Sequence, residues 1–472
     1  GGGLGGSGSP GGSLGSFYSY AIGQSLRLDG ATAYLTKNDF GTATNTAKRT
    51  FSTWIKRAVA TAPASYNHII GAGGSAIDGF GFTTSEQLQW LQGGAVTKDG
   101  VRKLRDVSSW YHVFTTWNAT DNELFIYVNG ELDYSSTGSI SALSKLGNTG
   151  HTTYIGKRSN AGTYIHGYLA DTVFLDGTIG SISDFAETKD GVWIPKDISA
   201  AGLTFGDNGF YLDYADSSDL GKDVSGKGNH FTSNNLGTDD QVLDSPTNNF
   251  ATMNFLDNLN WLSQGTTRES FSHANLEGSG TSWMARCTFP LDSGKWYWEI
   301  RKSTYSITGI YETDGAAHDS NHAYYFYAGN VADATSNRSS PTTLYSGTTA
   351  DGTIIGVEFD ADNLTLEFFA GGSSLHKINS VDAGKYTASF GTAANTTFQV
   401  NFGQDPTFCG QLTGGDVGTA TDSQGNGLFK YAPSSGFLAI CSANLPDPTI
   451  GPGQSTQADD KFNTVLYTGD GN

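Results

Sequence analysis

The stretch Glu123-Leu-Phe-Ile-Tyr-Val128, followed directly by Asn129-Gly130, decides the fold of this chain. Leu124, Ile126 and Val128 recur at every second position, so they share one face of a β-strand. Asn-Gly is the dipeptide favoured in a tight two-residue turn between antiparallel strands. The sequence therefore predicts a β-hairpin at this point.

Further short strands are expected on both sides of this hairpin. They cover residues 25–28, 49–57, 68–71, 110–117, 153–156 and 168–174. Turn residues separate them, and no long segment has the 3.6-residue periodicity of a helix. Seven or more strands at this spacing are typical of a β-sandwich.

A second group of strands follows residue 250. Its strongest signals are Gly294-Lys-Trp-Tyr-Trp-Glu-Ile300, Thr353-Ile-Ile-Gly-Val-Glu-Phe359 and Leu364-Thr-Leu-Glu-Phe-Phe369. Asp360-Ala-Asp-Asn363 supplies turn residues between the last two. Leu364, Leu366 and Phe368 are expected to line the buried face of the final strand. A second antiparallel sandwich is implied.

The predicted fold is all-β, with two antiparallel β-sandwiches in tandem. Residues 1–18 are a glycine-rich tether or stalk, because glycine supplies no side chain for a core. Residues 19–175 are the first sandwich, 176–249 an ordered connector with aromatic anchors, and 250–445 the second sandwich. Residues 446–472 are expected to be a Pro/Gly linker and the start of a further module.

Composition excludes several functions. The formal net charge of -19 at pH 7 disfavours binding to nucleic acid or to an anionic membrane. No apolar run reaches the length of a membrane span, and no signal peptide opens the chain. Cys287, Cys409 and Cys441 are far apart and lack metal-site spacing, so they are interpreted as buried free thiols.

The first module resembles the concanavalin A-like, laminin G-type lectin sandwich, and the second resembles a SPRY domain. The first resemblance rests on Leu28-Asp-Gly30, Thr53-Trp-Ile55, Trp110-Tyr-His-Val113, Leu124-Phe-Ile-Tyr-Val-Asn-Gly130, Tyr154-Ile-Gly156 and Gly167-Tyr-Leu-Ala-Asp171. The second rests on Gly294-Lys-Trp-Tyr-Trp-Glu-Ile300, Ile354-Ile-Gly-Val-Glu-Phe-Asp360, Leu366-Glu-Phe-Phe-Ala-Gly371 and Val400-Asn-Phe-Gly-Gln404.

The connector is similar to the joint between such modules in large bacteriophage virion proteins. It contains Asn208-Gly-Phe-Tyr-Leu-Asp213, Asp223-Val-Ser-Gly-Lys-Gly-Asn-His-Phe231 and Asp244-Ser-Pro-Thr-Asn-Asn249. The resemblance implies a non-enzymatic tail fibre, spike or appendage subunit of a virion, attached to other virion proteins and to a host-surface glycan or protein. Gly-rich stalks joining β-modules suggest a homotrimer. The alternatives are a capsid decoration protein and a secreted glycan-binding or glycan-degrading protein.

Sugar binding would use aromatic rings that stack on pyranose faces. Trp90, Tyr164 and the cluster Tyr324-Tyr-Phe-Tyr327 are the candidates. Because side chains alternate along a strand, half of that cluster is expected in the core, which leaves Tyr325 and Tyr327 as candidate ligand contacts.

Candidate residues also exist for a glycosidase site and for a calcium site. A sandwich glycosidase would need paired carboxylates, and the nearest motif is Glu131-Leu-Asp-Tyr-Ser-Ser136, in which Ser136 replaces the final acid. No cofactor is expected. A calcium ion would need several oxygen donors, for which Asp29, Asp78, Asp121 and Asp171 are candidates without a compact motif.

Overall fold

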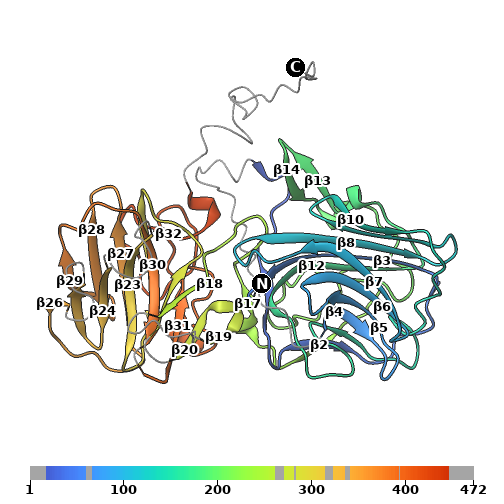
Figure 1. Cartoon of the computed structure of the whole chain (residues 1–472), viewed down its shortest axis with the longest axis horizontal. Coiled ribbons are helices and arrows are strands. Elements are labelled where there is room, and N and C mark those ends of the chain that lie inside the picture. Colours follow the sequence, from blue (N-terminus) through green and yellow to red (C-terminus); the bar gives the residue numbers. More distant parts are fainter. Residues whose placement is uncertain are drawn as a thin grey trace, which may run out of the picture.

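Two β-sandwiches lie side by side in the computed structural model of the chain (Figure 1). The structure describes residues 17–59, 66–260, 270–280, 283–313, 323–334, 341–392 and 394–445. Most of the predicted tether (residues 1–18) and all of residues 446–472 lie outside the described residues. The prediction of an all-β chain with two antiparallel sandwiches is confirmed.

The first sandwich packs two antiparallel sheets face to face. One sheet has the order β10(Glu131–Ser136), β9(Glu123–Val128), β8(Trp110–Asn118), β3(Lys48–Arg57), β12(His166–Asp176), β1(Ser25–Asp29) and β17(Gln241–Val242), with β15(Phe210–Leu212) paired to β12. The other has the order β16(Thr232–Asn234), β2(Tyr34–Lys37), β11(Thr153–Ile155), β4(Asn67–Ala72), β5(Asp78–Phe82), β6(Gln87–Gln92) and β7(Val96–Lys103). Their facing side chains form one continuous apolar core.

The hairpin between β9 and β10 is formed as the sequence predicts. Val128 pairs with Glu131, and the two turn residues Asn129 and Gly130 have φ values of 49° and 80°. Both are in the left-handed region that a two-residue turn of this kind requires. Leu124, Ile126 and Val128 are buried in the core at 0%, 0% and 2% exposure.

The predicted connector, residues 176–249, is built into the first sandwich. β15, β16 and β17 extend its sheets, and the hairpin of β13(Ala186–Lys189) and β14(Val192–Pro195) forms a small separate sheet. Aromatic residues anchor the segment, as expected: the Trp193 indole donates to His112 Nδ1 at 3.0 Å. Phe210 is fully buried in the core of the sandwich. The domain boundaries at residues 175, 249 and 445 stay predictions.

The second sandwich also packs two antiparallel sheets. One has the order β18(Met253–Asn260), β21(Trp283–Cys287), β30(Tyr386–Thr392), β23(Ser306–Glu312), β24(Ala323–Tyr327), β25(Asn330–Asp333) and β26(Thr342–Tyr345). The other has the order β19(Ser270–Ser272), β20(Glu277–Gly280), β31(Thr396–Asn401), β22(Lys295–Arg301), β27(Ile354–Asp360), β28(Thr365–Ala370) and β29(Ser373–Ile378), with β32(Leu438–Ala439) parallel to β22.

The β27–β28 turn differs in one residue from the sequence prediction. Leu366 and Phe368 are fully buried, as expected. Leu364, which was expected to line the same face, lies in the turn with φ of 53° and packs only partly against the core. Asp360 accepts a hydrogen bond from the Asn363 backbone at 3.0 Å, so the turn extends to residue 364 before pairing resumes at Thr365.

Short 3₁₀ turns link several strands. They are η1(Ile182–Asp184), η2(Ile198–Ala200), η3(Thr238–Asp240), η4(His273–Asn275), η5(Gly414–Asp416) and η6(Ser442–Asn444). None of the helices among the described residues is long and apolar enough to cross a membrane. The three cysteines are buried and form no disulfide, which agrees with their interpretation as free thiols.

The junction between the sandwiches is polar and buried. Arg27 on β1 forms an ion pair with Asp405 of the second sandwich, and it also contacts Asp240 at 3.3 Å. The Lys56 ammonium group donates to Asp244 at 2.7 Å and to the Phe250 carbonyl at 2.8 Å. Each buried charge therefore has partners, which offsets the cost of removing it from water.

Direct hydrogen bonds also join β12 to η4 across this junction. The Tyr168 hydroxyl donates to the Ala274 carbonyl at 2.7 Å, and the Ala274 N–H donates to His166 Nε2 at 3.1 Å. Asn275 donates to the Ala58 carbonyl at 2.6 Å. Ala274 has a φ of 52°, an uncommon value for alanine, so these contacts hold η4 in a strained turn.

Candidate functional site

Trp90 is not on the surface of the molecule. Its side chain is 1% exposed, and its indole N–H donates to the Thr115 hydroxyl at 2.7 Å inside the first core. The ring packs against Trp117 with 5.4 Å between centroids. A ring enclosed in this way presents no face to a sugar, so the prediction of Trp90 as a ligand contact is wrong. Residues of β6 alternate, and position 90 falls on the inner face.

Tyr164 belongs to a cluster of half-buried tyrosines on the outer face of the second sheet of the first sandwich. The loop from Lys157 to Tyr164 is closed by a β-bridge between these two residues. On β2 and β11, Leu35 and Ile155 point into the core, so Tyr34 and Tyr154 point outward. The Tyr34 ring centroid lies 6.1 Å from that of Tyr154 and 6.0 Å from that of Tyr164.

The Lys157 ammonium group lies among these three rings. Its distance to the ring centroid is 4.3 Å for Tyr34, 5.4 Å for Tyr164 and 5.6 Å for Tyr154. An ammonium group at this range is attracted by the electron-rich ring faces. In the described part of the chain, no carboxylate pairs with Lys157. We call Tyr34, Tyr154, Lys157 and Tyr164 the tyrosine–lysine cluster.

A flat strip of sheet lies beside this cluster. Gly71 on β4 pairs with Tyr154, and Gly79 on β5 pairs with Gly71. A Cβ atom on either glycine would come within 2.8 Å or 2.5 Å of the His68 imidazole, so the ring lies directly over both. Burial, together with the smaller effect of the Arg158 charge, lowers the pKa of His68 to about 3. The imidazole is therefore neutral at physiological pH.

The cluster can bind an oxygen-rich ligand. Within the described residues, none of the three phenol hydroxyl groups hydrogen-bonds to another protein group, so each can donate to a ligand or accept from one. The ammonium group adds a positive charge and further donors. Aromatic surface next to such donors is the chemistry that carbohydrate recognition uses.

Tyr325 and Tyr327 lie on the other sandwich, on the outward face of β24. Their neighbours Tyr324 and Phe326 are in the core at 3% and 0% exposure, which confirms the predicted alternation. Tyr325 is 7% exposed within a small apolar cluster on this face, and burial raises its pKa to about 12. Tyr327 is half-buried, and its centroid lies 6.5 Å from that of the exposed Tyr305. The two tyrosines are thus separate from the tyrosine–lysine cluster.

Comparison with known proteins identifies the fold of the first sandwich. A family described as the concanavalin A-like lectin/glucanases superfamily matches residues 29–180. The fold is concanavalin A-like, of the laminin G type. This match covers less than half of the chain, and a search of curated proteins finds no match.

Several solved structures are similar to parts of the chain. Domains LG4-5 of the mouse laminin alpha1 chain align at 12% identity over 88% of this chain and 96% of their own, with a TM-score of 0.28. A heptameric SAP-like pentraxin from Limulus polyphemus aligns at 17% identity over 34% and 80%, with a TM-score of 0.27. The SPRY domain of human HERC1 aligns at 16% identity over 26% and 84%, with a TM-score of 0.22.

The glycosidase alternative rests on Glu131, which lies on the edge strand β10 of the concanavalin A-like sandwich. Its side chain is 71% exposed and pairs with Arg102 at 2.5 Å. Asp133, two residues later, is buried and accepts a hydrogen bond from the Arg102 backbone at 2.9 Å. Glu131 is thus one half of a surface ion pair.

The four candidate calcium ligands of the same sandwich are each engaged locally. Asp29 accepts from the Ala33 N–H at 2.8 Å, Asp78 from Gly93 at 2.9 Å, Asp121 from the Asn118 amide at 2.8 Å, and Asp171 from the Tyr211 hydroxyl at 2.8 Å. Among the residues that the structure describes, no group of three or more His, Cys, Asp or Glu side chains is arranged to hold a metal ion. These four residues act in turns and in the interior.

Sequence reasoning found Tyr164 but missed its partners in the cluster. Tyr34 is far in sequence from Tyr154 and Lys157. The pairing of β2 with β11 brings the three residues together. Tyr34 and Tyr154 each stand next to a core residue in a strand of three or four residues. That alternation is the signal that could have placed them on the outer face.

Proposed function

We propose that this chain is a non-enzymatic structural subunit of a bacteriophage particle that attaches to glycans on the host surface through its concanavalin A-like sandwich. The lectin-like fold supports a glycan-binding or protein-binding role. The order of the modules and the connector motifs, which are similar to those of large virion proteins, support the virion assignment. The proposed localisation is therefore the virion, extracellular after lysis.

The observation that carries the binding role is the tyrosine–lysine cluster. Three aromatic rings, three hydroxyl groups and one ammonium group gather on one sheet face, with rings 6.0–6.1 Å from Tyr34. Two of the tyrosines stand on paired strands, so the sheet holds their geometry before any ligand arrives. A preorganised site loses less entropy on binding than a flexible one.

The test is binding of the full chain to an array of bacterial surface oligosaccharides, followed by titration calorimetry with the strongest ligand. Tyr164→Ala and Lys157→Ala should each weaken binding at least tenfold. Matched controls are Tyr305→Ala on the other sandwich and Lys227→Ala on an exposed turn, which should bind as the parent does. Equal binding by all four variants would move the site away from the cluster, and binding to no oligosaccharide would remove the glycan role.

The assembly state and the place on the particle are separate parts of the proposal. The glycine-rich sequence of residues 1–18 supports close packing of several stalks about an axis, and we propose a homotrimer. Light scattering of the full chain should give three times the monomer mass, and a monomer would contradict this. Immuno-electron microscopy of purified particles should place the chain at the tail or a fibre. Labelling of the capsid shell would favour a decoration role instead.

A further inference from the structure

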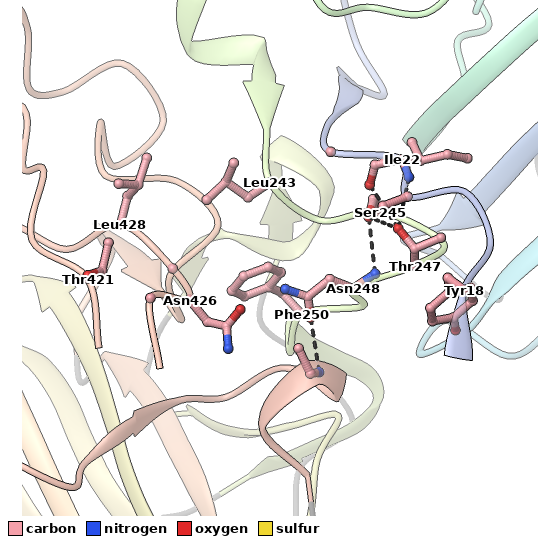
Figure 2. A pocket seen from close by; sticks show the side chains of 15 residues that line it. Tyr18, Ile22, Leu243, Ser245, Thr247, Asn248, Phe250, Thr421, Asn426 and Leu428 are labelled. Carbon is pink, nitrogen blue, oxygen red and sulfur yellow. Dashed lines mark hydrogen bonds between the residues drawn. The ribbon is translucent and has the colours of Figure 1, made fainter. Parts of the chain in front are cut away.

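A pocket of about 400 Å³ lies at the junction of the two sandwiches (Figure 2). One wall comes from residues 18–23, before β1, and the floor comes from residues 243–250. The opposite wall comes from residues 421–428 of the second sandwich and from Ala443. Ligand pockets in proteins are commonly of this size and commonly lie between domains.

Hydrogen bonds hold the walls of this pocket in place. Thr247 accepts from the Ile22 N–H at 3.0 Å and donates back to the Ile22 carbonyl at 2.9 Å. On the opposite side, the Asn426 N–H donates to Asp422 at 2.8 Å. Ala443 donates to Asn248 Oδ1 at 3.1 Å, so the floor is tied to the opposite wall. The pocket therefore exists before a ligand binds.

The lining has no charged side chain. Its apolar part is largely aliphatic, with Ile22, Leu243 and Leu428 among its members. Such a lining disfavours an ionic ligand, because a charge that enters loses its hydration without gaining a partner.

Two carboxamides supply complementary hydrogen-bonding groups, and Figure 2 shows them turned toward each other across the pocket. Asn248 uses its oxygen for Ala443, and its side chain also hydrogen-bonds the Cys441 thiol, which leaves one of its two amide N–H groups for the pocket. Asn426 donates from its nitrogen to Asn444 Oδ1 at 2.7 Å, which leaves its oxygen on the pocket side. Among the described residues, no protein group donates to the Asn426 side-chain oxygen, so this oxygen can accept from a ligand. The pocket thus offers a donor from its floor and an acceptor from the wall of the second sandwich.

A peptide group fits this arrangement better than a sugar does. Its carbonyl and its N–H point in opposite directions, so it can accept from Asn248 and donate to Asn426. A sugar would gain from an exposed aromatic face, but the Phe250 ring in the pocket floor is only 1% exposed, and the other ring of the lining, Tyr18, is itself partly buried. The aliphatic lining matches an apolar side chain next to such a peptide group.

We infer that the junction pocket binds an uncharged, extended peptide segment of a partner protein, with one apolar side chain among Ile22, Leu243 and Leu428 and one peptide group between Asn248 and Asn426. The site requires both sandwiches. It goes beyond glycan attachment, because it would give the same chain a separate contact for another protein of the assembly.

The test uses N-acetyl-leucine N-methylamide as a probe of the peptide chemistry. Methyl groups of Ile22, Leu243 and Leu428 are followed by NMR in the full chain. We expect saturable shifts of these methyl signals, with Asn426→Ala weakening the probe about tenfold because its acceptor is lost. Ala21→Trp, which fills the pocket from an exposed wall position, should abolish the response.

Three results separate this inference from its alternatives. The corresponding lysine and glutamate derivatives should give no saturable response, because the lining cannot pair with their charges. A response to methyl glucoside equal to that of the leucine probe, or no response to the leucine probe, would overturn the inference. Tyr164→Ala should leave the peptide response unchanged while it weakens glycan binding, so the two proposals fail independently.

Discussion

Arg27 and Asp405 form an ion pair across the junction of the two sandwiches, with side chains that are 0% and 1% exposed. Burial alone would raise the pKa of Asp405, but the nearby Arg27 guanidinium lowers it below its ordinary value. Asp405 also accepts the Cys409 N–H at 2.8 Å and the Thr407 N–H at 3.0 Å. The pair is thus fixed from both sides of the junction.

Removal of Asp405 should therefore weaken the whole molecule. Asp405→Ala leaves the Arg27 charge buried and short of a partner, and breaking a buried pair in this way typically costs about 3–5 kcal/mol. We expect a lower free energy of unfolding in urea and a separation of the unfolding of the two sandwiches into distinct transitions. Glu131→Ala, which breaks a surface ion pair with Arg102, is the control and should change the midpoint little.

Stability should depend on pH through Asp171. This carboxyl group is buried on β12, and its burial raises the pKa to about 7, although the hydrogen bond from Tyr211 acts in the opposite direction. The folded chain thus binds this proton more tightly than the unfolded chain does. The protonated Asp171 carboxyl group contributes its full stabilisation below the pKa that this group has in the unfolded chain. This stabilisation is lost as pH rises toward 7. The loss is about 4 kcal/mol in order of magnitude.

Asp171→Asn removes this titration and keeps an oxygen for the Tyr211 hydroxyl. The variant should lose less stability than the parent between about pH 4 and pH 7 in urea titrations at a series of pH values. The same slope in both proteins would show that Asp171 ionises normally in the folded chain.

His166 should make the junction sensitive to acid. Burial lowers the pKa of this imidazole to about 4, and its Nε2 must be unprotonated to accept the Ala274 N–H. The neutral His166 imidazole therefore contributes its full stabilisation above the pKa of histidine in the unfolded chain. This stabilisation is lost as pH falls toward 4. Hydrogen exchange at the Ala274 amide should accelerate over this range. His166→Gln, which has a non-titrating acceptor, should make exchange there less dependent on pH.

Lys157 should make glycan binding dependent on salt if the ligand carries negative charge. Lys157→Arg keeps the charge, whereas Lys157→Met keeps only the aliphatic chain over the rings. With a charged oligosaccharide, the arginine variant should retain the fall in affinity between about 50 mM and 500 mM salt, and the methionine variant should lose it. Calorimetry at both salt concentrations measures the difference. A neutral oligosaccharide serves as the control ligand.

The sequence predicts the regular parts of this fold well because their side chains alternate over several residues. The β9 strand and its Asn129-Gly130 turn form as predicted. The role of the connector was harder to predict. β15, β16 and β17 have two or three residues each, too few for a period of two to be visible. Their place is decided by pairing with β12, β2 and β1, which are distant in sequence.

The candidate site shows the same limit. Trp90 and Tyr164 are both large aromatic residues near turns, but only the register of β6 shows that Trp90 faces inward. The junction pocket could not be predicted, because its walls come from residues near 20, 245 and 425. No local pattern links segments whose contact depends on how two complete sandwiches dock.

The buried junction also fixes the distance between the tyrosine–lysine cluster and the junction pocket. Sandwiches that share buried ion pairs and a strained turn cannot pivot freely, so each copy of the chain holds its outward-facing cluster and its junction pocket at a constant separation. In the proposed assembly of several copies, the proposed glycan sites would form an array with a set spacing. A surface whose receptors match that spacing would be gripped by many weak contacts at once, whereas a surface with other spacings would engage only one at a time. The junction would then select among surfaces by geometry, independently of which sugar each site prefers.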